Sequence, residues 1–318
     1  MMHCRDWQLP TRNARAAGVL ALALLMLVLA GCASTPQLAE STERELPRQA
    51  LLEDTPFHGQ RDYQCGPASL AMVLNATGVP VEVDTLIPQV FLPGREGSVQ
   101  PEMLGTVRRH GRIPFRIDGN LDTLLTEIDA GHPVVVMQNL SLPAWPVWHY
   151  AVAIGFDLDE ETLILHSGMA PERIESFKRF DATWARSDRW AFVALSPGTL
   201  PATGDGKAAL DAIADFERVQ GAQAALPAWD ALVARYPEHA MGHFALGNAR
   251  YATGDRQGAI AAFDNAVTQD PDLAVAWLNL GLLRRELSQP EAARQALQRA
   301  AALPGAWQEQ ARDTLDTL

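Results

Sequence analysis

The sequence predicts an α+β domain followed by a separate all-α domain that is built from repeats. Between residues 56 and 197, helical apolar patterns come first and short apolar strands follow, an order typical of α+β proteins. After residue 206 the chain is rich in alanine, and similar residues recur 34 positions apart. This period is typical of stacked helical repeats. A length of 318 residues is enough for two such domains.

The N-terminal residues, 1–31, have the layout of an export signal. Arg5, Arg12 and Arg15 precede an apolar run over residues 16–30. This run is shorter than the roughly 20 apolar residues that a membrane span needs. It ends in Leu-Ala-Gly before Cys32, which resembles the lipobox of bacterial lipoproteins. The resemblance implies cleavage before Cys32 and a lipid on its sulfur; the alternative is a plain signal peptide with an incidental cysteine.

The residues after Cys32 bear on location. Ala33 and Ser34 lack the aspartate that retains Gram-negative lipoproteins at the inner membrane. The lipobox resemblance therefore implies an outer-membrane lipoprotein that faces the periplasm. Residues 32–55 are expected to form the lipidated N-terminus and a polar tether, because they are polar and contain proline and glutamate.

The composition excludes some classes of function. Acidic residues outnumber basic ones by 38 to 26, which gives a net charge of −12, and no cluster of Lys and Arg stands out. A nucleic-acid partner is therefore not expected. No cluster of His, Cys and carboxylates has the spacing of a metal site, and no cofactor motif is present, so neither a metal nor a cofactor is predicted.

Helices and strands can be placed in order along residues 56–197. Apolar spacing, proline near helix starts and glycine at helix ends predict three helices, over 66–77, 101–111 and 121–131, the last with Asn120 as its N-cap. Four strands are predicted after them, over 133–137, 149–156, 162–166 and 190–195. The middle two are expected to form a hairpin across the acidic turn 157–161. Residues 198–206 have the composition of a linker.

The repeats fill residues 207–318. Pairs 34 residues apart share their residue type at several positions: Leu246 and Leu280, Gly247 and Gly281, Ala259 and Ala293, Phe263 and Leu297, Ala266 and Ala300, and Pro237 and Pro271. This pattern resembles the tetratricopeptide repeat (TPR), with His243 and Trp277 at the expected aromatic position of the first helix. A degenerate unit is predicted from about Lys207, and a capping helix over Trp307–Leu318. The resemblance implies a concave surface for a protein partner.

Cys65 is the candidate nucleophile. Cys4 leaves with the signal and Cys32 is expected to carry lipid, so Cys65 has no partner for a disulfide. It lies at the N-terminus of a predicted helix, where unpaired N–H groups and the helix dipole favour a thiolate of lowered pKa. Gly66 is expected to leave room for a substrate carbonyl. The N–H of Cys65 and the amide of Gln60 are candidate donors to an oxyanion.

His149 is the candidate base for this thiol. It opens an apolar strand and is followed by small residues, so it can lie at the rim of a cleft and face a helix N-terminus. The remaining histidines of the mature chain that we considered, His58, His110, His132 and His243, have no such context and are interpreted as structural.

These two motifs resemble those of a known family. Gln60-x4-Cys65-Gly-Pro-Ala-Ser-Leu is followed, 84 residues after the cysteine, by His149-Tyr-Ala-Val. This resembles the bacteriocin-processing, double-glycine-leader cysteine peptidases over residues 56–197, and most closely their stand-alone lipoprotein relatives with TPR repeats. The resemblance implies a papain-like fold. It also implies Cys65 as nucleophile, His149 as general base and acid, and Gln60 as oxyanion donor.

The sequence departs from this family at the third catalytic position. The family usually has an aspartate on the strand after the histidine strand, whereas this chain has Ile-Leu-His166-Ser167-Gly. Ser167 is nearest to the expected place, His166 is second, and Asp157 is a further substitute. Because this group orients the histidine and does not attack, its replacement is expected to lower activity without abolishing it.

The leading hypothesis is a lipid-anchored cysteine peptidase that cleaves a peptide or protein substrate and binds a protein partner through its TPR segment. One alternative is a catalytically weak or inactive binding or assembly lipoprotein, and another is a cell-wall peptide amidase. Residues 142–148 precede His149 and contain two tryptophans, Trp145 and Trp148. They are expected either to line a substrate cleft or to cover the core.

Overall fold

The computed structural model describes residues 36–60, 64–92, 94 and 97–318. The predicted export signal and Cys32, the candidate lipidation site, lie outside the described residues. Among the residues that are described, every helix is too short or too polar to span a membrane.

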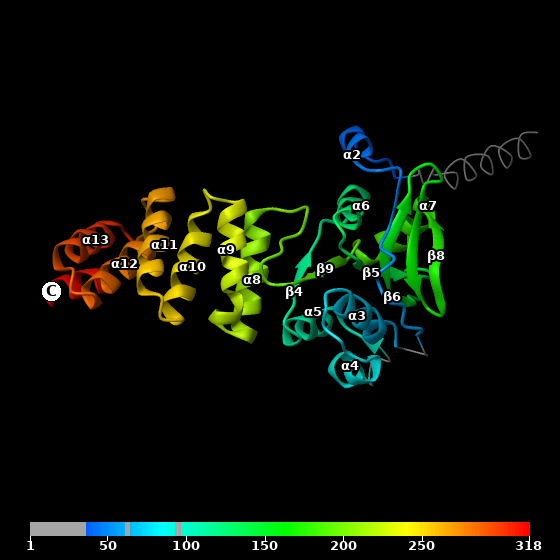
Figure 1. The fold of residues 1–318 in the computed structure, drawn as a ribbon, viewed down its shortest axis with the longest axis horizontal. Helices are drawn as coiled ribbons and strands as arrows, with labels where there is room; N and C mark the ends of the chain where they lie inside the picture. The colour runs from blue at the N-terminus through cyan, green and yellow to red at the C-terminus, as the bar shows by residue number, and fades with distance from the viewer. Residues whose placement is uncertain (1–35, 61–63, 93, 95–96) are drawn as a thin grey trace, which may run out of the picture. The chain divides into compact units, whose positions relative to one another are not determined.

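The N-terminal domain is a seven-stranded antiparallel sheet with helices on both faces (Figure 1). Its strands follow the order β4-β9-β5-β6-β7-β8. In addition, β1 pairs with the C-terminal end of β6, at residues 155–157. They are β1 (Gln49–Leu51), β4 (Ile113–Arg116), β5 (Val134–Asn139), β6 (Trp148–Asp157), β7 (Thr162–Ser167), β8 (Ala170–Ser176) and β9 (Ala191–Leu195). A separate hairpin joins β2 (Phe91–Leu92) to β3 (Gly97–Ser98).

The helices divide between the two faces of the sheet. One face packs against α3 (Cys65–Ala76), α4 (Val83–Val90) and α5 (Gln100–Arg109). The other packs against α6 (Leu121–Asp129) and α7 (Phe177–Trp184), and a short helix α2 (Glu40–Glu45) precedes β1. Alternation along β5 accounts for both cores: Val135 and Met137 belong to the α3 side, and Val134 and Val136 to the α6 side.

Several predicted elements are found close to their expected bounds. Helix α3 begins one residue before the predicted start, and α6 has Asn120 as its N-cap, with the Oδ1 accepting a hydrogen bond from the Thr123 N–H at 2.8 Å. The hairpin that was expected across the turn 157–161 is present and is formed by β6 and β7. Eight elements were not predicted: α2, α4, α7, β1, β2, β3, β4 and β8. Two of them, α2 and β1, lie in the segment that was expected to be a tether, and β1 is paired with β6 in the sheet.

The C-terminal domain consists of antiparallel helices in sequence order: α8 (Gly206–Gln220), α9 (Ala222–Arg235), α10 (Ala240–Ala252), α11 (Arg256–Gln269), α12 (Ala274–Glu286), α13 (Pro290–Ala302) and α14 (Gln308–Asp316). The repeat positions have the packing expected of them. A Cβ on Gly247 would lie 2.5 Å from the Phe263 ring, and one on Gly281 would lie 2.6 Å from Leu297 Cγ. Only glycine permits these helix crossings.

The two repeats also share a polar contact. The ring nitrogen Nε2 of His243 donates to the Pro237 carbonyl at 2.9 Å, and Nε1 of Trp277 donates to the Pro271 carbonyl at the same distance. Both the donors and the acceptors are 34 residues apart. The predicted fold class, an α+β domain followed by a TPR solenoid, is therefore confirmed.

Polar contacts join the two domains, which belong to one unit over residues 37–318. Arg108 of α5 pairs with Asp215 of α8 at 2.8 Å. The buried carboxylate of Glu127 holds the connecting segment: it accepts hydrogen bonds from the N–H groups of Ala202 and Thr203, and it contacts His132 Nδ1 at 2.7 Å. The centre of the predicted linker, at Ala202 and Thr203, is thus bound to the first domain.

Candidate active site

Cys65 is the first residue of α3, a helix whose residues 66–74 are all buried. The thiol is partly buried, and the backbone N–H groups of Tyr150, Gly66 and Cys65 itself surround the sulfur. Burial raises the pKa of the Cys65 thiol, and these N–H groups oppose the rise without cancelling it. The expectation of a lowered pKa is therefore wrong for this site, because the cost of desolvating the thiolate exceeds the contribution of the helix N-terminus.

His149 lies near the start of β6, before the part of this strand that pairs with β7. Its Nε2 atom is 2.9 Å from the Oγ of Ser167 at the end of β7. Burial and, to a smaller extent, the positive charge of Arg173 on β8 together lower the pKa of His149 to about 4. The imidazole is therefore neutral at neutral pH, as a general base must be.

Of the three candidates for the orienting group, only Ser167 contacts His149 in the described residues. Both ring nitrogens of His166 are occupied: Nε2 contacts the Thr55 carbonyl at 3.0 Å, and Nδ1 accepts from the Glu172 N–H. Asp157 is at the opposite end of β6, where its carboxylate accepts hydrogen bonds from Gln49 and from the following turn. Among the described residues, therefore, neither His166 nor Asp157 forms a hydrogen bond with the imidazole of His149.

Gln60 lies beside the same strand ends. Its side chain is buried, its Nε2 is 3.5 Å from the Tyr150 carbonyl, and its backbone N–H donates to the Gly168 carbonyl at 3.0 Å. Residues 149–150 and 167–168 are therefore the place where Gln60, Cys65, His149 and Ser167 converge. All four were singled out from sequence, and their catalytic roles stay a prediction.

The thiol and the imidazole are connected through Tyr150 and are not hydrogen-bonded to each other in the described residues. Among the described residues, no hydrogen bond joins the Cys65 sulfur to His149, and the link between them is the N–H of Tyr150, the next residue along β6. Hydrogen bonds between catalytic groups are often long in unliganded enzymes and shorten when substrate binds. Because Nε2 of His149 contacts Ser167, Nδ1 is the other ring nitrogen that could take a proton.

Gly66 has a different role from the expected one. A Cβ at this position would lie 2.3 Å from the Oγ of Ser98 and 3.2 Å from Met103 Sδ. The space beside Gly66 is filled by β3 and α5 and is not open to a substrate. The glycine is required because the β2–β3 hairpin packs directly against the first turn of α3.

The two tryptophans before His149 do not cover the core. Trp145 is 73% exposed and Trp148 is 50% exposed. Of the two interpretations offered by the sequence, the core-covering one is therefore wrong.

The other histidines make hydrogen bonds away from the thiol. His58 contacts Asn75, His110 contacts Gln89, and His132 and His243 have the partners given above. Within the described part of the chain, no three His, Cys, Asp or Glu side chains lie close enough to hold a metal ion.

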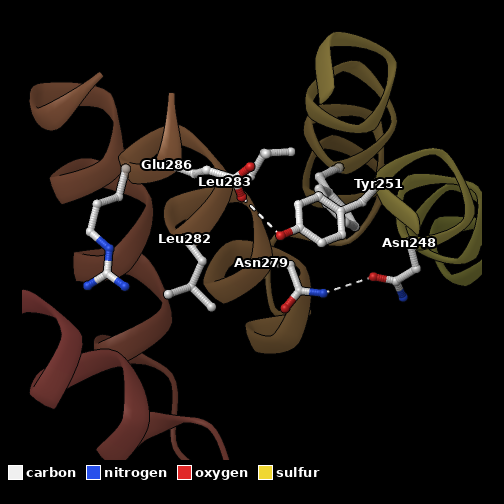
Figure 2. A pocket seen from close by; sticks show the side chains of 8 residues that line it. Asn248, Tyr251, Asn279, Leu282, Leu283 and Glu286 are labelled. Carbon is white, nitrogen blue, oxygen red and sulfur yellow. Dashed lines mark hydrogen bonds between the residues drawn. The ribbon is translucent and has the colours of Figure 1, made fainter. Parts of the chain in front are cut away.

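The TPR domain contains a second candidate site, a groove formed by α8, α10 and α12. One hollow of about 520 Å³ is lined by polar and apolar side chains together, and another of about 550 Å³ is lined mainly by apolar ones; Asn248 borders both. Figure 2 shows that Asn279 reaches toward Asn248, with Nδ2 2.9 Å from Oδ1, and that the Tyr251 hydroxyl donates to Glu286 at 2.9 Å. The groove thus offers amide groups beside an apolar surface.

In comparisons with known proteins, family models match parts of the chain in both domains. Residues 52–191 match the model of the Peptidase_C39 like family. Residues 210–274 and 244–307 match the tetratricopeptide repeat model. A comparison with curated proteins finds no match.

Several solved structures are similar to parts of this chain. A putative C39-like peptidase from Bacillus anthracis is 18% identical, with coverage of 47% of this chain and 98% of that chain and a TM-score of 0.40. The TPR2B domain of yeast Sti1 in its pHsp70 complex is 17% identical, with coverage of 35% and 93% and a TM-score of 0.33. The Yersinia enterocolitica type III secretion translocator chaperone SycD is 14% identical, with coverage of 35% and 81% and a TM-score of 0.33.

Proposed function

We propose that this chain, which joins a C39-like peptidase domain to tetratricopeptide repeats, is a cysteine peptidase that cleaves an amide bond in a peptide or protein. The observation that carries the proposal is the convergence of the Cys65 thiol, the His149–Ser167 pair and the Gln60 amide on two adjacent strand ends. A thiol, a neutral imidazole and amide donors are the groups that acyl transfer requires.

The reaction begins from a neutral pair, because the pKa of the thiol is raised and that of the imidazole is lowered. His149 takes the Cys65 proton at Nδ1 while the sulfur attacks the substrate carbonyl carbon. The Cys65 N–H and the second hydrogen of the Gln60 amide bind the oxyanion. The imidazolium then protonates the leaving amine. Water, deprotonated by His149, hydrolyses the thioester and restores the thiol.

The decisive experiment compares the wild type with Cys65→Ser and His149→Gln on a peptide library, with products read by mass spectrometry. We expect cleavage by the wild type and none above background by either variant. His110→Gln serves as the matched control, since His110 contacts Gln89 and not the site. If the wild type cleaves no peptide or periplasmic protein, the binding-lipoprotein alternative replaces this proposal. Release of muropeptides from cell wall would indicate the amidase alternative.

The TPR groove is proposed to hold an extended segment of the substrate or of a partner protein. Amide side chains such as Asn248 and Asn279 can each pair with main-chain groups, and the neighbouring hollow can take apolar side chains. A photo-crosslinker at Leu282 in the Cys65→Ser variant would capture the bound protein. We expect the captured protein to be cleaved by the wild type; a captured protein that resists cleavage would identify a partner in place of a substrate.

The location of the enzyme is likewise a proposal, and it depends on the lipobox at Cys32. We propose that the lipid holds the protein at the outer membrane, where the enzyme faces the periplasm. Fractionation of cells that produce Cys32→Ser is expected to move the protein out of the outer-membrane fraction. Retention of the variant in that fraction would contradict the lipid anchor.

A further inference from the structure

Exposed apolar side chains are concentrated beside the candidate active site. Of the twelve large hydrophobic side chains that are strongly exposed in the described residues, six lie between residues 140 and 169. We use the name apolar rim for five of them: Leu142, Trp145, Val147, Trp148 and Met169. Their exposed fractions range from 50% to 74%. Such a concentration on a soluble domain usually marks a binding surface.

The loop that carries most of the apolar rim is held in one conformation by hydrogen bonds. The buried Asn139 closes it, with Oδ1 accepting from the N–H groups of Ser141 and Val147 at 3.1 and 3.0 Å. From the other side, the Arg186 guanidinium donates to the carbonyls of Asn139 and Ser141. The loop conformation is therefore fixed before a ligand arrives, which lowers the entropic cost of binding to it.

Two residues of the apolar rim are neighbours of the candidate catalytic groups. Trp148 immediately precedes His149 on β6. Met169 follows β7, and its Sδ lies 3.3 Å from the Cβ position of Gly59, the residue before Gln60. Two members of the apolar rim therefore adjoin residues of the candidate catalytic group, Trp148 in the chain and Met169 in space.

The chemistry of the apolar rim favours a peptide over a lipid surface as its ligand. Residues 140–148 contain no Lys or Arg, although the chain has 26 such residues. Loops and helices that bind membranes usually combine aromatic residues with basic ones, which attract anionic headgroups. Because residues 140–148 carry no charge, they instead suit the uncharged apolar side chains of a peptide.

We propose that the apolar rim determines specificity, by binding large apolar side chains of the substrate on both sides of the scissile amide. This inference rests on the proposed function and adds the substrate class to it. Loss of one apolar contact typically changes the specificity constant by roughly tenfold. Trp145 and Met169 are the two residues best suited to a test, because both are strongly exposed and neither belongs to the catalytic groups.

The test uses thiol-alkylating peptides as probes of the full chain. N-acetyl dipeptidyl chloromethyl ketones with Phe-Leu or with Ser-Asn side chains are compared by the rate at which they label Cys65, measured by intact mass. We expect the Phe-Leu peptide to label the wild type at least about tenfold faster than the Ser-Asn peptide does. This is roughly the effect of one apolar contact on the specificity constant. Trp145→Ser and Met169→Gln should remove most of this preference. Iodoacetamide, which has no side chain to bind, should label all three proteins equally.

The matched control is Trp307→Ser, because Trp307 is also exposed but belongs to the TPR domain. This variant should keep the full preference for Phe-Leu. Equal labelling of the wild type by both peptides, in a manner that still depends on His149, would overturn the specificity inference and leave the peptidase proposal intact. Labelling by both peptides that does not depend on His149 would overturn the peptidase proposal as well.

The lipid alternative has its own readout. Vesicles of brominated phosphatidylcholine quench a tryptophan that enters the bilayer, and the difference between the wild type and Trp145→Phe isolates the signal of Trp145. We expect no difference in quenching. A difference, together with an unchanged Phe-Leu preference in Trp145→Ser, would show that the apolar rim is a membrane contact and would overturn the inference.

Discussion

The Nε2 atom of His149 lies 2.9 Å from the hydroxyl of Ser167, at the end of the neighbouring strand. In this position a serine takes the place of the aspartate that the sequence family would provide. A hydroxyl orients the imidazole but contributes no negative charge, and therefore does not raise its pKa. The imidazole is therefore held by a neutral hydrogen bond, and its pKa stays far below the ordinary value of 6.5.

Ser167→Ala is expected to reduce kcat/KM about fivefold, since a neutral hydrogen bond contributes about 1 kcal/mol. Ser167→Asn keeps an acceptor at the same position and should retain most of the activity. The measurement is kcat/KM on a peptide that the wild type cleaves. An unchanged rate in Ser167→Ala would mean that the ring is oriented by its packing alone.

The pH dependence of activity should have its acidic limb near pH 4, because His149 must be neutral to take the thiol proton and its pKa is about 4. Arg173→Gln removes a positive charge that disfavours the imidazolium. The pKa of His149 should therefore rise, and the acidic limb should move to higher pH. Profiles of kcat/KM against pH for the wild type and this variant test the shift.

Arg179→Gln is the matched control for this shift, since Arg179 is exposed and pairs with Glu175. Its acidic limb should coincide with that of the wild type. An equal shift in both variants would indicate a general effect of net charge.

Glu127→Ala is expected to destabilise the protein by about 3 kcal/mol, because it leaves several buried polar groups without their partner. Burial raises the pKa of Glu127, but hydrogen bonds from His132, Thr203 and Ala202 outweigh burial and lower it below the ordinary 4.5. The ionised carboxylate therefore adds stability above pH 4.5, and this contribution is lost as the pH falls through the lowered pKa.

Urea unfolding at pH 7 and at progressively lower pH tests this expectation. The difference between the wild type and Glu127→Ala should be largest at pH 7 and should shrink in acid. The exposed Glu160→Ala is the control. If Glu127→Ala were as stable as the control at pH 7, the hydrogen bonds between the linker and the first domain would contribute nothing to the free energy of unfolding.

Gly281→Ala should destabilise the TPR domain by about 1–3 kcal/mol, the usual cost of overpacking, because the new methyl group would lie 2.6 Å from Leu297 Cγ. Gly105→Ala in α5 is the control, since its Cβ would meet only the end of the Arg109 side chain, at 3.4 Å. Thermal unfolding followed by circular dichroism distinguishes the two variants. A neutral effect at Gly281 would mean that the two helices separate without cost.

The elements that were predicted from sequence are those with an unbroken local signal. Helix α3 has apolar spacing and a proline in its first turn, and β5 and β6 are nearly continuous apolar runs. Two of the elements that were missed contain a conflicting proline. Pro88 lies inside α4, and Pro114 lies inside β4, which is tolerated because β4 is an edge strand of the sheet. Most of β8 is exposed and has no apolar alternation.

Motif spacing identified the residues that converge on the site, but not their ionisation. The helix N-terminus at Cys65 indicates a lowered pKa, and only the packing of β6 over the sulfur reveals that desolvation is larger. In the same way, sequence offers three partners for His149. Choosing Ser167 over His166 and Asp157 requires the register of β6 against β7, which depends on the whole sheet.

The raised pKa of Cys65 also affects how the resting protein would withstand oxidants. Peroxides react with thiolates, and a thiol that stays protonated is converted to sulfenic acid only slowly. Cys65 is the only cysteine among the described residues, so no second thiol is available there to rescue an oxidised one. In the proposed mechanism, a proton that stays on the sulfur until His149 removes it would protect Cys65 between turnovers.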